Sequence, residues 1–507
     1  MLFALSPIAL VWAGLVFFTL LTLLHKLYTA LTNPLRKFPG PWLCHYSNVP
    51  YSYWLLRRRK EFWIHSMHEK YGPVVCVAPN EISFNTAQSW KDIYGFRHGH
   101  QTFIKSEFYD GYMFIEEGIH GIITSRDPKE HASMRRFMSH AFSSLALKEQ
   151  EPLVEDIIEH LVANVREIGV KKGEVMEFDW WLRLCMFDIM GSLAFGKSFD
   201  ALKNGGQHPS VKFIHEATRQ VGIIDIMKRF PIAGKIYALF FARTLLRLLE
   251  GNKKHEQFAL KIAQERLANP SKRPDFLTRL QENMDESQGA IHIAAQAAEL
   301  LQAGTDTTNI TIKTALNYIL RDKALYNRLK NEIRTRFPTY KSINAQDAVS
   351  LPFLRTVILE AMRIYAPVAP GLPRLVPRGG DTVDGIFVPE GTVVSTNAFS
   401  ANLSSRNWED PMTFKPDRWA KDRVSKSWDI LEAAQPFSLG PRGCIGQNLA
   451  WVEMNFIICK LMWSFDFELV NADMDLHRDS FIDTLWNGAP LYLRVRVQTD
   501  INGEYGI

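Results

Sequence analysis

This sequence of 507 residues contains few cysteines and has a small net charge. Only five cysteines occur, at widely scattered positions, and no two of them form a CxxC pair. A disulfide framework is therefore not expected, and the body of the chain should face a reducing compartment. The formal net charge is only +5, and no run of basic residues alternates with aromatic ones, which argues against nucleic acid as a partner.

Several catalytic signatures are missing as well. The sequence contains no HExxH zinc-protease motif, no GxSxG nucleophile elbow and no GxGxxG dinucleotide motif. The string from Gly191 to Ser198 does match the P-loop pattern GxxxxGK[ST], but bulky Leu193 and Phe195 would fill the loop. The residues before it also have a helical pattern, whereas a P-loop follows a strand. We interpret the match as chance and expect neither a hydrolase nor a nucleotide-binding protein.

The amino-terminal segment has no charged side chain at all through residues 1–24 and is rich in Leu, Phe, Val and Ile. About 20 such residues suffice to cross a bilayer. A cleaved signal peptide is disfavoured because no basic residue precedes the run and no clear cleavage site follows it. Basic residues begin at Lys26, which predicts a single membrane-spanning anchor at residues 1–25 with the body of the chain on the cytosolic side.

Residues 26–41 are predicted to form a basic hinge, because they end in Phe38-Pro39-Gly40-Pro41, a sequence that cannot continue a helix. The remainder, residues 42–507, shows no internal repeat and no low-complexity linker, so one large domain is expected. Apolar residues recur at intervals of three and four from about 157 to 349, which predicts a long helical body. Strand patterns occur at 71–84 and 491–497, and hairpins are predicted at 382–396. The expected fold is therefore mainly α with small β-sheets.

Cys444 differs from the other cysteines in its surroundings. The segment from Phe437 to Gly446 is FSLGPRGCIG, and a long apolar helical segment follows at 448–463. Backbone N–H groups at the start of a helix favour a thiolate, and the glycines on either side leave room for a flat macrocycle against the sulfur. Amide groups directed at the sulfur would also tune its donation of electrons. We predict that Cys444 is a metal ligand.

A second polar segment, Ala303 to Thr308, interrupts a long apolar stretch from about 291 to 320. Four consecutive polar residues in a buried helix are costly unless they find partners. Without further evidence, a capped or kinked helix explains the pattern as well as a functional role does.

The cysteine segment contains the complete pattern Phe-x-x-Gly-x-Arg-x-Cys-x-Gly, and through it the chain resembles the cytochrome P450 family from about Phe38 to Val497. The stretch from Trp90 to Gln150 is most similar to fungal secondary-metabolite hydroxylases, including those that act on trichothecenes. The resemblance implies haem bound through Cys444, with Arg442 as a partner of a haem propionate and Phe437 at the start of the haem loop.

The resemblance extends to other residues. It implies that Asp306 and Thr307 deliver protons to iron-bound oxygen. Further expected propionate partners are His131, Arg135 and Arg374. The expected structural network comprises Glu360, Arg363 and Arg418.

The implied activity is that of a monooxygenase that inserts one atom of dioxygen into an apolar small molecule, such as a terpenoid or polyketide intermediate. Electrons would come from NADPH through a separate reductase. The substrate pocket is expected to draw on Phe103–Thr124, Asp200–Arg229, Leu301, Val368–Leu372 and Trp486–Ala489. Two alternatives stay open: a haem-thiolate isomerase or dehydratase that does not use dioxygen, and a membrane-bound haem-binding protein without catalysis.

Overall fold

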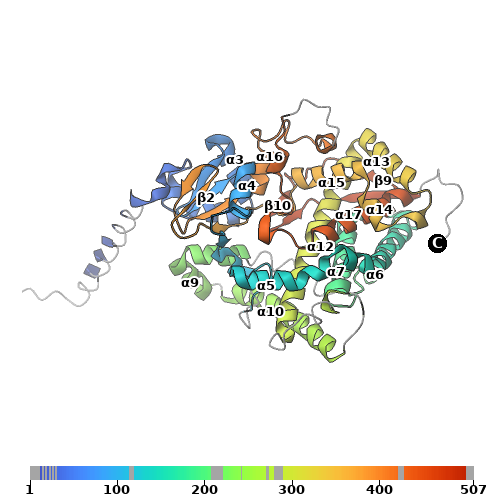
Figure 1. The fold of residues 1–507 in the computed structure, drawn as a ribbon, viewed down its shortest axis with the longest axis horizontal. Coiled ribbons are helices and arrows are strands. Elements are labelled where there is room, and N and C mark those ends of the chain that lie inside the picture. Colours follow the sequence, from blue (N-terminus) through green and yellow to red (C-terminus); the bar gives the residue numbers. More distant parts are fainter. Residues whose placement is uncertain are drawn as a thin grey trace, which may run out of the picture.

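The computed structural model describes residues 31–112, 119–206, 221–240, 242–269, 275–278, 289–420 and 428–497, together with Arg273 and scattered positions from 12 to 28. Helices form most of this part of the chain, and the sheets are spread across it, with β2 on the left of Figure 1 near α3 and α4, and β9 on the far right. The prediction of a mainly helical domain with small sheets is confirmed.

The helices have the following bounds: α2 Val49–Leu56, α3 Lys60–Tyr71, α4 Ala87–Tyr94, α5 Pro128–Ser139, α6 Ser144–Asn164, α7 Phe178–Ala194, α9 Pro231–Phe240, α10 Ala242–Ala268, α12 Ala290–Arg321, α13 Lys323–Arg336, α14 Ala345–Val349, α15 Pro352–Ile364, α16 Ala398–Leu403 and α17 Gln447–Ser464. Short 3-10 segments used below are η1 Pro34–Lys37, η3 Glu107–Tyr112, η7 Pro416–Trp419 and η9 Gly440–Arg442. The helix α7 runs into the first half of the string that matched a P-loop, so a helix stands where that motif requires a preceding strand.

The strands are β1 Val74–Ala78, β2 Glu81–Phe84, β3 Ile104–Lys105, β4 Met176–Glu177, β5 Arg374–Leu375, β6 Asp381–Val383, β7 Ile386–Val388, β8 Val393–Thr396, β9 Phe465–Leu469, β10 Ser480–Ile482, β11 Trp486–Gly488 and β12 Tyr492–Val497. The largest sheet has the order β1-β2-β8-β5-β3, in which β2 and β8 are parallel and the other pairs are antiparallel. This sheet joins segments that lie about 300 residues apart in the chain.

The hairpin prediction at 382–396 is right for the first half and wrong for the second. β6 and β7 pair across the turn at Asp384-Gly385, as predicted. β8 does not continue this hairpin but pairs with β2 in the large sheet. Burial explains the difference, because Ile386 and Phe387 in β7 are exposed whereas Val394 in β8 is fully buried. A strand with such an apolar residue is more stable inside the larger sheet.

The helix α12 is the longest helix of the described part, and it packs against α7, α10, α15 and α17. Most of its side chains from Ile310 to Ile319 are buried, as expected for a helix surrounded by others. Because α17 follows the Cys444 loop and also packs on α12, the two segments singled out in the sequence belong to neighbouring elements.

The predicted anchor at residues 1–25 falls largely outside the described residues. Where positions from 12 to 32 are described, they are helical, and the side chains of Trp12, Phe17 and Leu24 are exposed. A search of the described residues finds no helix with the length and apolar character needed to cross a membrane. In the predicted hinge, Leu35 and Phe38 are buried against the large sheet, so this segment packs on the domain.

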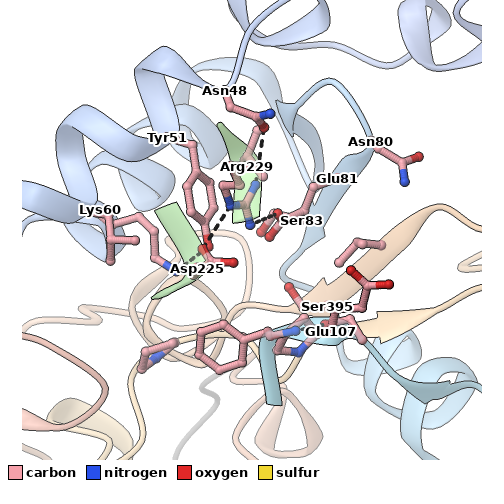
Figure 2. A pocket seen from close by; sticks show the side chains of 18 of the residues that line it. Asn48, Tyr51, Lys60, Asn80, Glu81, Ser83, Glu107, Asp225, Arg229 and Ser395 are labelled. Carbon is pink, nitrogen blue, oxygen red and sulfur yellow. Dashed lines mark hydrogen bonds and ion pairs between the residues drawn. The ribbon is translucent and has the colours of Figure 1, made fainter. Parts of the chain in front are cut away.

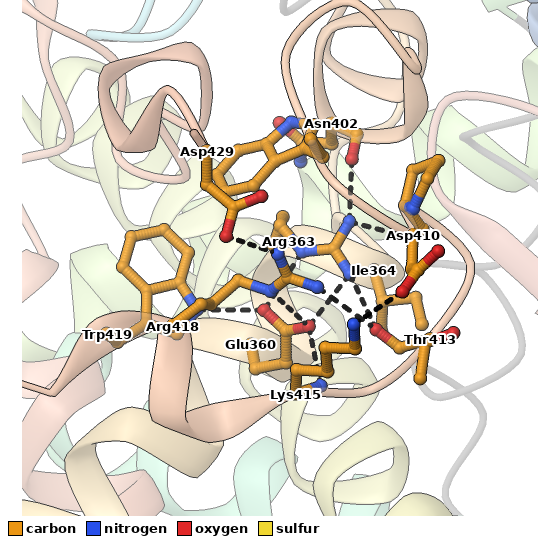
Figure 3. Close-up of polar contacts among 12 residues, drawn as sticks. Glu360, Arg363, Ile364, Asn402, Asp410, Thr413, Lys415, Arg418, Trp419 and Asp429 are labelled. Carbon is orange, nitrogen blue, oxygen red and sulfur yellow. Dashed lines mark hydrogen bonds and ion pairs between the residues drawn. The ribbon is translucent and has the colours of Figure 1, made fainter. Parts of the chain in front are cut away.

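A buried ionic network fixes the chain ahead of the Cys444 loop (Figure 3). The Glu360 carboxylate accepts hydrogen bonds from Arg363 at 2.8 and 2.9 Å, from Arg418 at 3.1 Å and from Trp419 at 2.8 Å. Arg418 also pairs with Asp429 at 2.7 Å. Arg363 donates to three backbone carbonyls, those of Asn402, Pro411 and Thr413. The network therefore ties α15 to the segment that contains η7 and leads toward residue 437.

Candidate functional site

The Cys444 loop is a tight turn between η9 and α17. The backbone N–H of Cys444 donates to the carbonyl of Phe437 at 2.8 Å, which closes the loop. Gly440 has a φ of +69° and lies so close to the carbonyl of Tyr94 that a Cβ atom would collide with it. The sequence predicted that Cys444 would begin a helix, but α17 begins three residues later, at Gln447. The amide of Gly446, at the N-cap of that helix, donates to the Cys444 sulfur.

Cys444 is the one exposed cysteine among the five. Protein nevertheless surrounds its thiol closely enough that burial raises the pKa, while the Gly446 amide and the nearby Arg135 lower it. The sulfur is therefore available to a ligand and already has an amide and a cation that favour the thiolate.

Five basic side chains form what we call the basic cluster: Lys105, His131, Arg135, Arg374 and Arg442. Burial and the positive charges of the other four lower the pKa of His131 to about 3, so it is neutral. Burial, together with Arg442 and Arg374, lowers the pKa of Lys105 to about 6. Burial and Arg374 lower the pKa of Arg442 to about 10. Burial is the largest cause of all three pKa shifts, and the like charges of the cluster add to it.

Contacts within the basic cluster leave donors unused. Arg135 donates to the carbonyl of Gly443 at 2.6 Å, directly beside Cys444. Arg442 donates to the carbonyls of Ser125 and Arg126 at 2.7 and 3.0 Å. The Nε and Nη1 groups of Arg374 are buried and have no hydrogen-bond partner in the described structure. A buried guanidinium without a partner is costly, which points to an anionic group at this position.

These features fit haem. Among the described residues there is no group of three His, Cys, Asp or Glu side chains that could hold a metal ion. A porphyrin supplies four nitrogen ligands, and its two propionates carry the negative charge that the basic cluster lacks. Cys444 and the basic cluster are the residues that would hold it.

The polar segment of α12 lies in an unbroken helix. Thr307 donates its hydroxyl to the carbonyl of Ala303 at 2.7 Å, so this hydroxyl bonds within the helix, and Thr305 does the same to Leu301. Ala303 and Thr307, one turn apart, are half-buried, whereas Thr305 is buried. The α12 face with Ala303 and Thr307 is therefore the more accessible one. The assignment is α-helical throughout residues 290–321, so the segment with Thr305 and Thr307 does not interrupt the helix.

Asp306 forms an ion pair with Arg183 of α7, with 3.0 Å between Oδ1 and Nε. Both atoms lack a well-aligned hydrogen bond, so the contact is electrostatic and its geometry leaves room for rearrangement. The side chain of Asp306 is 6% exposed and that of Arg183 is 20% exposed. The guanidinium thus gives the buried carboxylate the opposite charge that it requires.

A further carboxyl group, that of Glu453, lies between α12 and α17. Glu453 of α17 accepts a hydrogen bond from Thr308 of α12 at 3.2 Å, and its other oxygen has no partner in the described structure. Burial raises the pKa of Glu453 to about 8, although the hydrogen bond from Thr308 opposes the shift. At neutral pH this side chain is therefore mostly protonated, next to the segment with Asp306 and Thr307.

Comparison with known proteins agrees with this geometry. The family model described as Cytochrome P450 matches residues 45–493. The chain belongs to the cytochrome P450 family.

Three similar proteins cover nearly the whole chain. Cytochrome P450 monooxygenase ORF11 of Penicillium roqueforti is 43% identical, over 88% of this chain and 92% of its own length. Cytochrome P450 monooxygenase BipB of Cochliobolus sativus is 39% identical, over 93% of this chain and 94% of its own length. Cytochrome P450 monooxygenase aclL of Aspergillus oryzae is 34% identical, over 98% and 99%. The prediction of a haem-dependent, oxygen-incorporating oxidoreductase is therefore confirmed.

Several site residues of this cytochrome P450 escaped the sequence analysis. Lys105 joins the basic cluster, Arg183 pairs with Asp306, and Glu453 contacts Thr308. Glu299 of α12 accepts hydrogen bonds from the Ile123 amide at 2.5 Å and from Thr124 at 2.7 Å. None of these residues stands in a recognisable motif. The apolar run that contains Glu453 was a weak signal, because a carboxylate within such a run needs a reason to be there.

Parts of the expected substrate pocket come together. Residues from three of the predicted ranges line one cavity of about 410 Å³: Ser106, Glu107, Phe108, Gly222, Asp225, Lys228, Arg229, Pro370 and Gly371. Leu301 does not line this cavity and is fully buried. Residues 113–118 and 207–220 of the predicted ranges lie outside the described residues.

The raised pKa of Glu453 predicts a dependence of stability on pH. The ordinary pKa is 4.5 and the folded pKa is about 8, so the bound proton stabilises the folded chain fully below pH 4.5, and this contribution is lost as pH rises to about 8. Glu453→Gln keeps an acceptor for Thr308 without the titration. We expect its stability relative to the parent protein to increase by up to about 1.4 kcal/mol per pH unit in that window.

Thermal unfolding at pH 5, 6.5 and 8 measures this difference. Glu468→Gln is the control, because Glu468 pairs with Arg494 and Arg496 on the surface and is half exposed. The stability of Glu468→Gln relative to the parent protein should not change with pH in this way. A constant difference between Glu453→Gln and the parent protein across the three pH values would contradict the prediction.

Proposed function

We propose that this cytochrome P450 inserts one oxygen atom into an apolar small molecule in secondary metabolism, with a terpenoid or polyketide intermediate as substrate. One observation carries the proposal: an accessible thiol with an amide donor beside a partly unpaired basic cluster. The relatives named as monooxygenases in fungi support the reaction class, and they disfavour the isomerase, the dehydratase and the non-catalytic haem-binding protein.

We assign the haem-binding roles as follows. Cys444 would bind the haem iron through its thiolate, and Phe437 holds the Cys444 backbone through the loop hydrogen bond. Arg135, Arg374, Arg442 and His131 would bind the propionates, as the sequence predicted, and Lys105 joins them. The haem, when bound, supplies the activation of dioxygen, for which a thiolate ligand is suited. Glu360, Arg363 and Arg418 keep the structural role, since they hold the chain that leads to the cysteine loop.

Asp306 and Thr307 are proposed to manage protons on the distal side. The Thr307 hydroxyl can release the Ala303 carbonyl and donate its proton toward the accessible face of α12. Asp306 is the acid that restores this proton, through water. Arg183 is proposed to position Asp306, because its guanidinium pairs with the buried carboxylate at 3.0 Å.

Electrons are proposed to come from NADPH through a separate reductase, as expected for this family.

The charge-free residues 1–24 are proposed to be a single anchor in the endoplasmic reticulum membrane, with the domain on the cytosolic side. Protease treatment of sealed microsomes tests this arrangement. The domain should be digested without detergent, and its protection would contradict the proposed topology.

The first functional prediction concerns Cys444 and the substrate. Microsomes with this chain and a fungal reductase, supplied with NADPH and an extract of a gene-deletion strain, should convert one accumulated compound to a product 16 mass units heavier, the mass of one oxygen atom. Cys444→Ser should lose both the product and the strongly red-shifted carbon monoxide complex of a haem thiolate. Mass spectrometry with ¹⁸O₂ measures the incorporation.

Cys459→Ser is the matched control, because Cys459 is buried in α17 away from the loop. It should keep both properties. Conversion without NADPH and dioxygen would favour an isomerase or a dehydratase, and a normal spectrum in Cys444→Ser would refute the ligand assignment.

The second functional prediction concerns Thr307. Thr307→Ala should still fold and take up haem, because one hydroxyl typically contributes only about 1 kcal/mol. Product per NADPH should fall steeply, since proton delivery commonly contributes about a hundredfold or more, and hydrogen peroxide should take its place. Thr314→Ala, which removes another hydroxyl bonded within α12, is the control. Unchanged coupling in Thr307→Ala would assign the relay to another group, such as Thr308.

A further inference from the structure

The cavity of about 410 Å³ lies between the large sheet and the helix at 221–229 (Figure 2). Apolar side chains line part of it, among them Leu55, Val77 and Val393. Charged side chains line the remainder, and Figure 2 shows Arg229 directed toward Glu81, Asp225 and Asn48. The cavity therefore combines an apolar surface with a concentrated group of charges.

One pair of strands separates this cavity from the basic cluster. β3 and β5 are adjacent, with Lys105 opposite Arg374 in register. Both of these residues belong to the basic cluster, whereas their chain neighbours Ser106, Pro373 and Leu375 line the cavity. Because successive side chains in a strand point to opposite faces, the two faces of this strand pair serve the two sites. The cavity thus lies beside the proposed haem site.

Arg229 links the helix at 221–229 to two other elements. Its guanidinium pairs with Glu81 of β2 at 2.7 Å and with Asp225 of its own helix at 2.9 Å. It also lies over the Tyr51 ring of α2, at 3.7 Å from the ring centre. The pair with Asp225 stays within one helix, so it joins no elements. The contacts with Glu81 and Tyr51 hold the helix against the sheet and α2.

Electrostatics favour this closed arrangement. Burial alone would lower the pKa of Arg229, but Glu81, Tyr51 and Asp225 raise it well above its usual range. The charges at this end of the cavity also compensate each other, since Lys60 pairs with Glu61 and donates to the Tyr51 hydroxyl. The network therefore serves to hold elements together, and the apolar lining is left to contact a ligand.

Lys228, the residue before Arg229, makes a second attachment. It donates to the carbonyl of Glu107 at 2.9 Å and pairs with Asp110 at 3.2 Å. Both partners lie in η3, on another side of the cavity. Two consecutive cations thus fasten one helix to two different parts of the domain. Separating this helix from the sheet requires the contact between Arg229 and Glu81 to break.

We propose that this cavity is the outer chamber of the substrate route, and that the ion pair between Arg229 and Glu81 is a latch that limits the size of the molecule it admits. The inference rests on the proposed function, because the route leads to the haem site. A small ligand passes without displacement of the helix. A bulky apolar ligand enters only when the latch opens, so the latch sets its rate of association.

Haem-loaded protein with two nitrogen ligands of different size tests the latch. Imidazole and the bulky azole clotrimazole both bind ferric haem and shift its absorption, which stopped-flow spectroscopy follows. Glu81→Gln keeps the shape and an acceptor for Arg229 but removes the charge. We expect it to raise the association rate of clotrimazole about tenfold, as for loss of one charge-assisted hydrogen bond, and to leave the rate of imidazole unchanged.

Asp381→Asn is the matched control. Asp381 pairs with Arg97 at 2.7 Å, its exposure is close to that of Glu81, and it does not line the cavity. It should change neither rate. The double variant with Glu81→Gln and Arg229→Met, which leaves no unmatched charge between β2 and the helix, should repeat the effect if the single variant folds poorly.

An unchanged clotrimazole rate in both latch variants, or an equal increase for both ligands, would overturn the latch. The parent protein also distinguishes the latch from the proposed function. If it gave no absorption shift with imidazole, the haem site itself, and the latch with it, would be refuted.

Discussion

Repulsion among the basic side chains near Cys444 is the constraint around which the site is built. Positive charges in a partly buried volume raise the free energy of the fold unless an anion joins them. The chain limits this cost by keeping His131 neutral and by directing Arg135 and Arg442 to backbone carbonyls. Arg374 keeps donors without partners. A bound dianion such as haem would therefore stabilise the fold as well as complete the site.

The elements that hold the site come from distant parts of the chain. The cysteine loop is fixed on one side by α17 and on the other by the segment tied to Glu360. The helix α17 reaches α12 through Glu453 and Thr308, so a buried hydrogen bond links the helix that follows the cysteine loop to the segment proposed to deliver protons. A shift of either helix would change both sides of the site together.

The strand pair β3 and β5 has two uses. One face presents Lys105 and Arg374 to the basic cluster, and the other face borders the cavity that we propose as the outer chamber. Each of these strands is only two residues long, but successive side chains point to opposite faces, so the pair can border both sites. The proposed entry of substrate and the proposed retention of haem would therefore depend on the same small piece of sheet.

The sequence by itself determined the local features. The segment from Phe437 to Gly446 predicted the cysteine ligand, and the resemblance carried by that segment implied the network of Glu360, Arg363 and Arg418. The helical period of α12 and the turn at Asp384-Gly385 could likewise be predicted from neighbouring residues in the sequence. Only the tertiary structure decided which distant residues meet. β8 pairs with β2 because its side chains are buried there, and Lys105, Arg183 and Glu81 gain their partners from other elements. Their isolated charges carry no periodicity or motif, since long-range electrostatic partners are set by packing, which a local pattern does not encode.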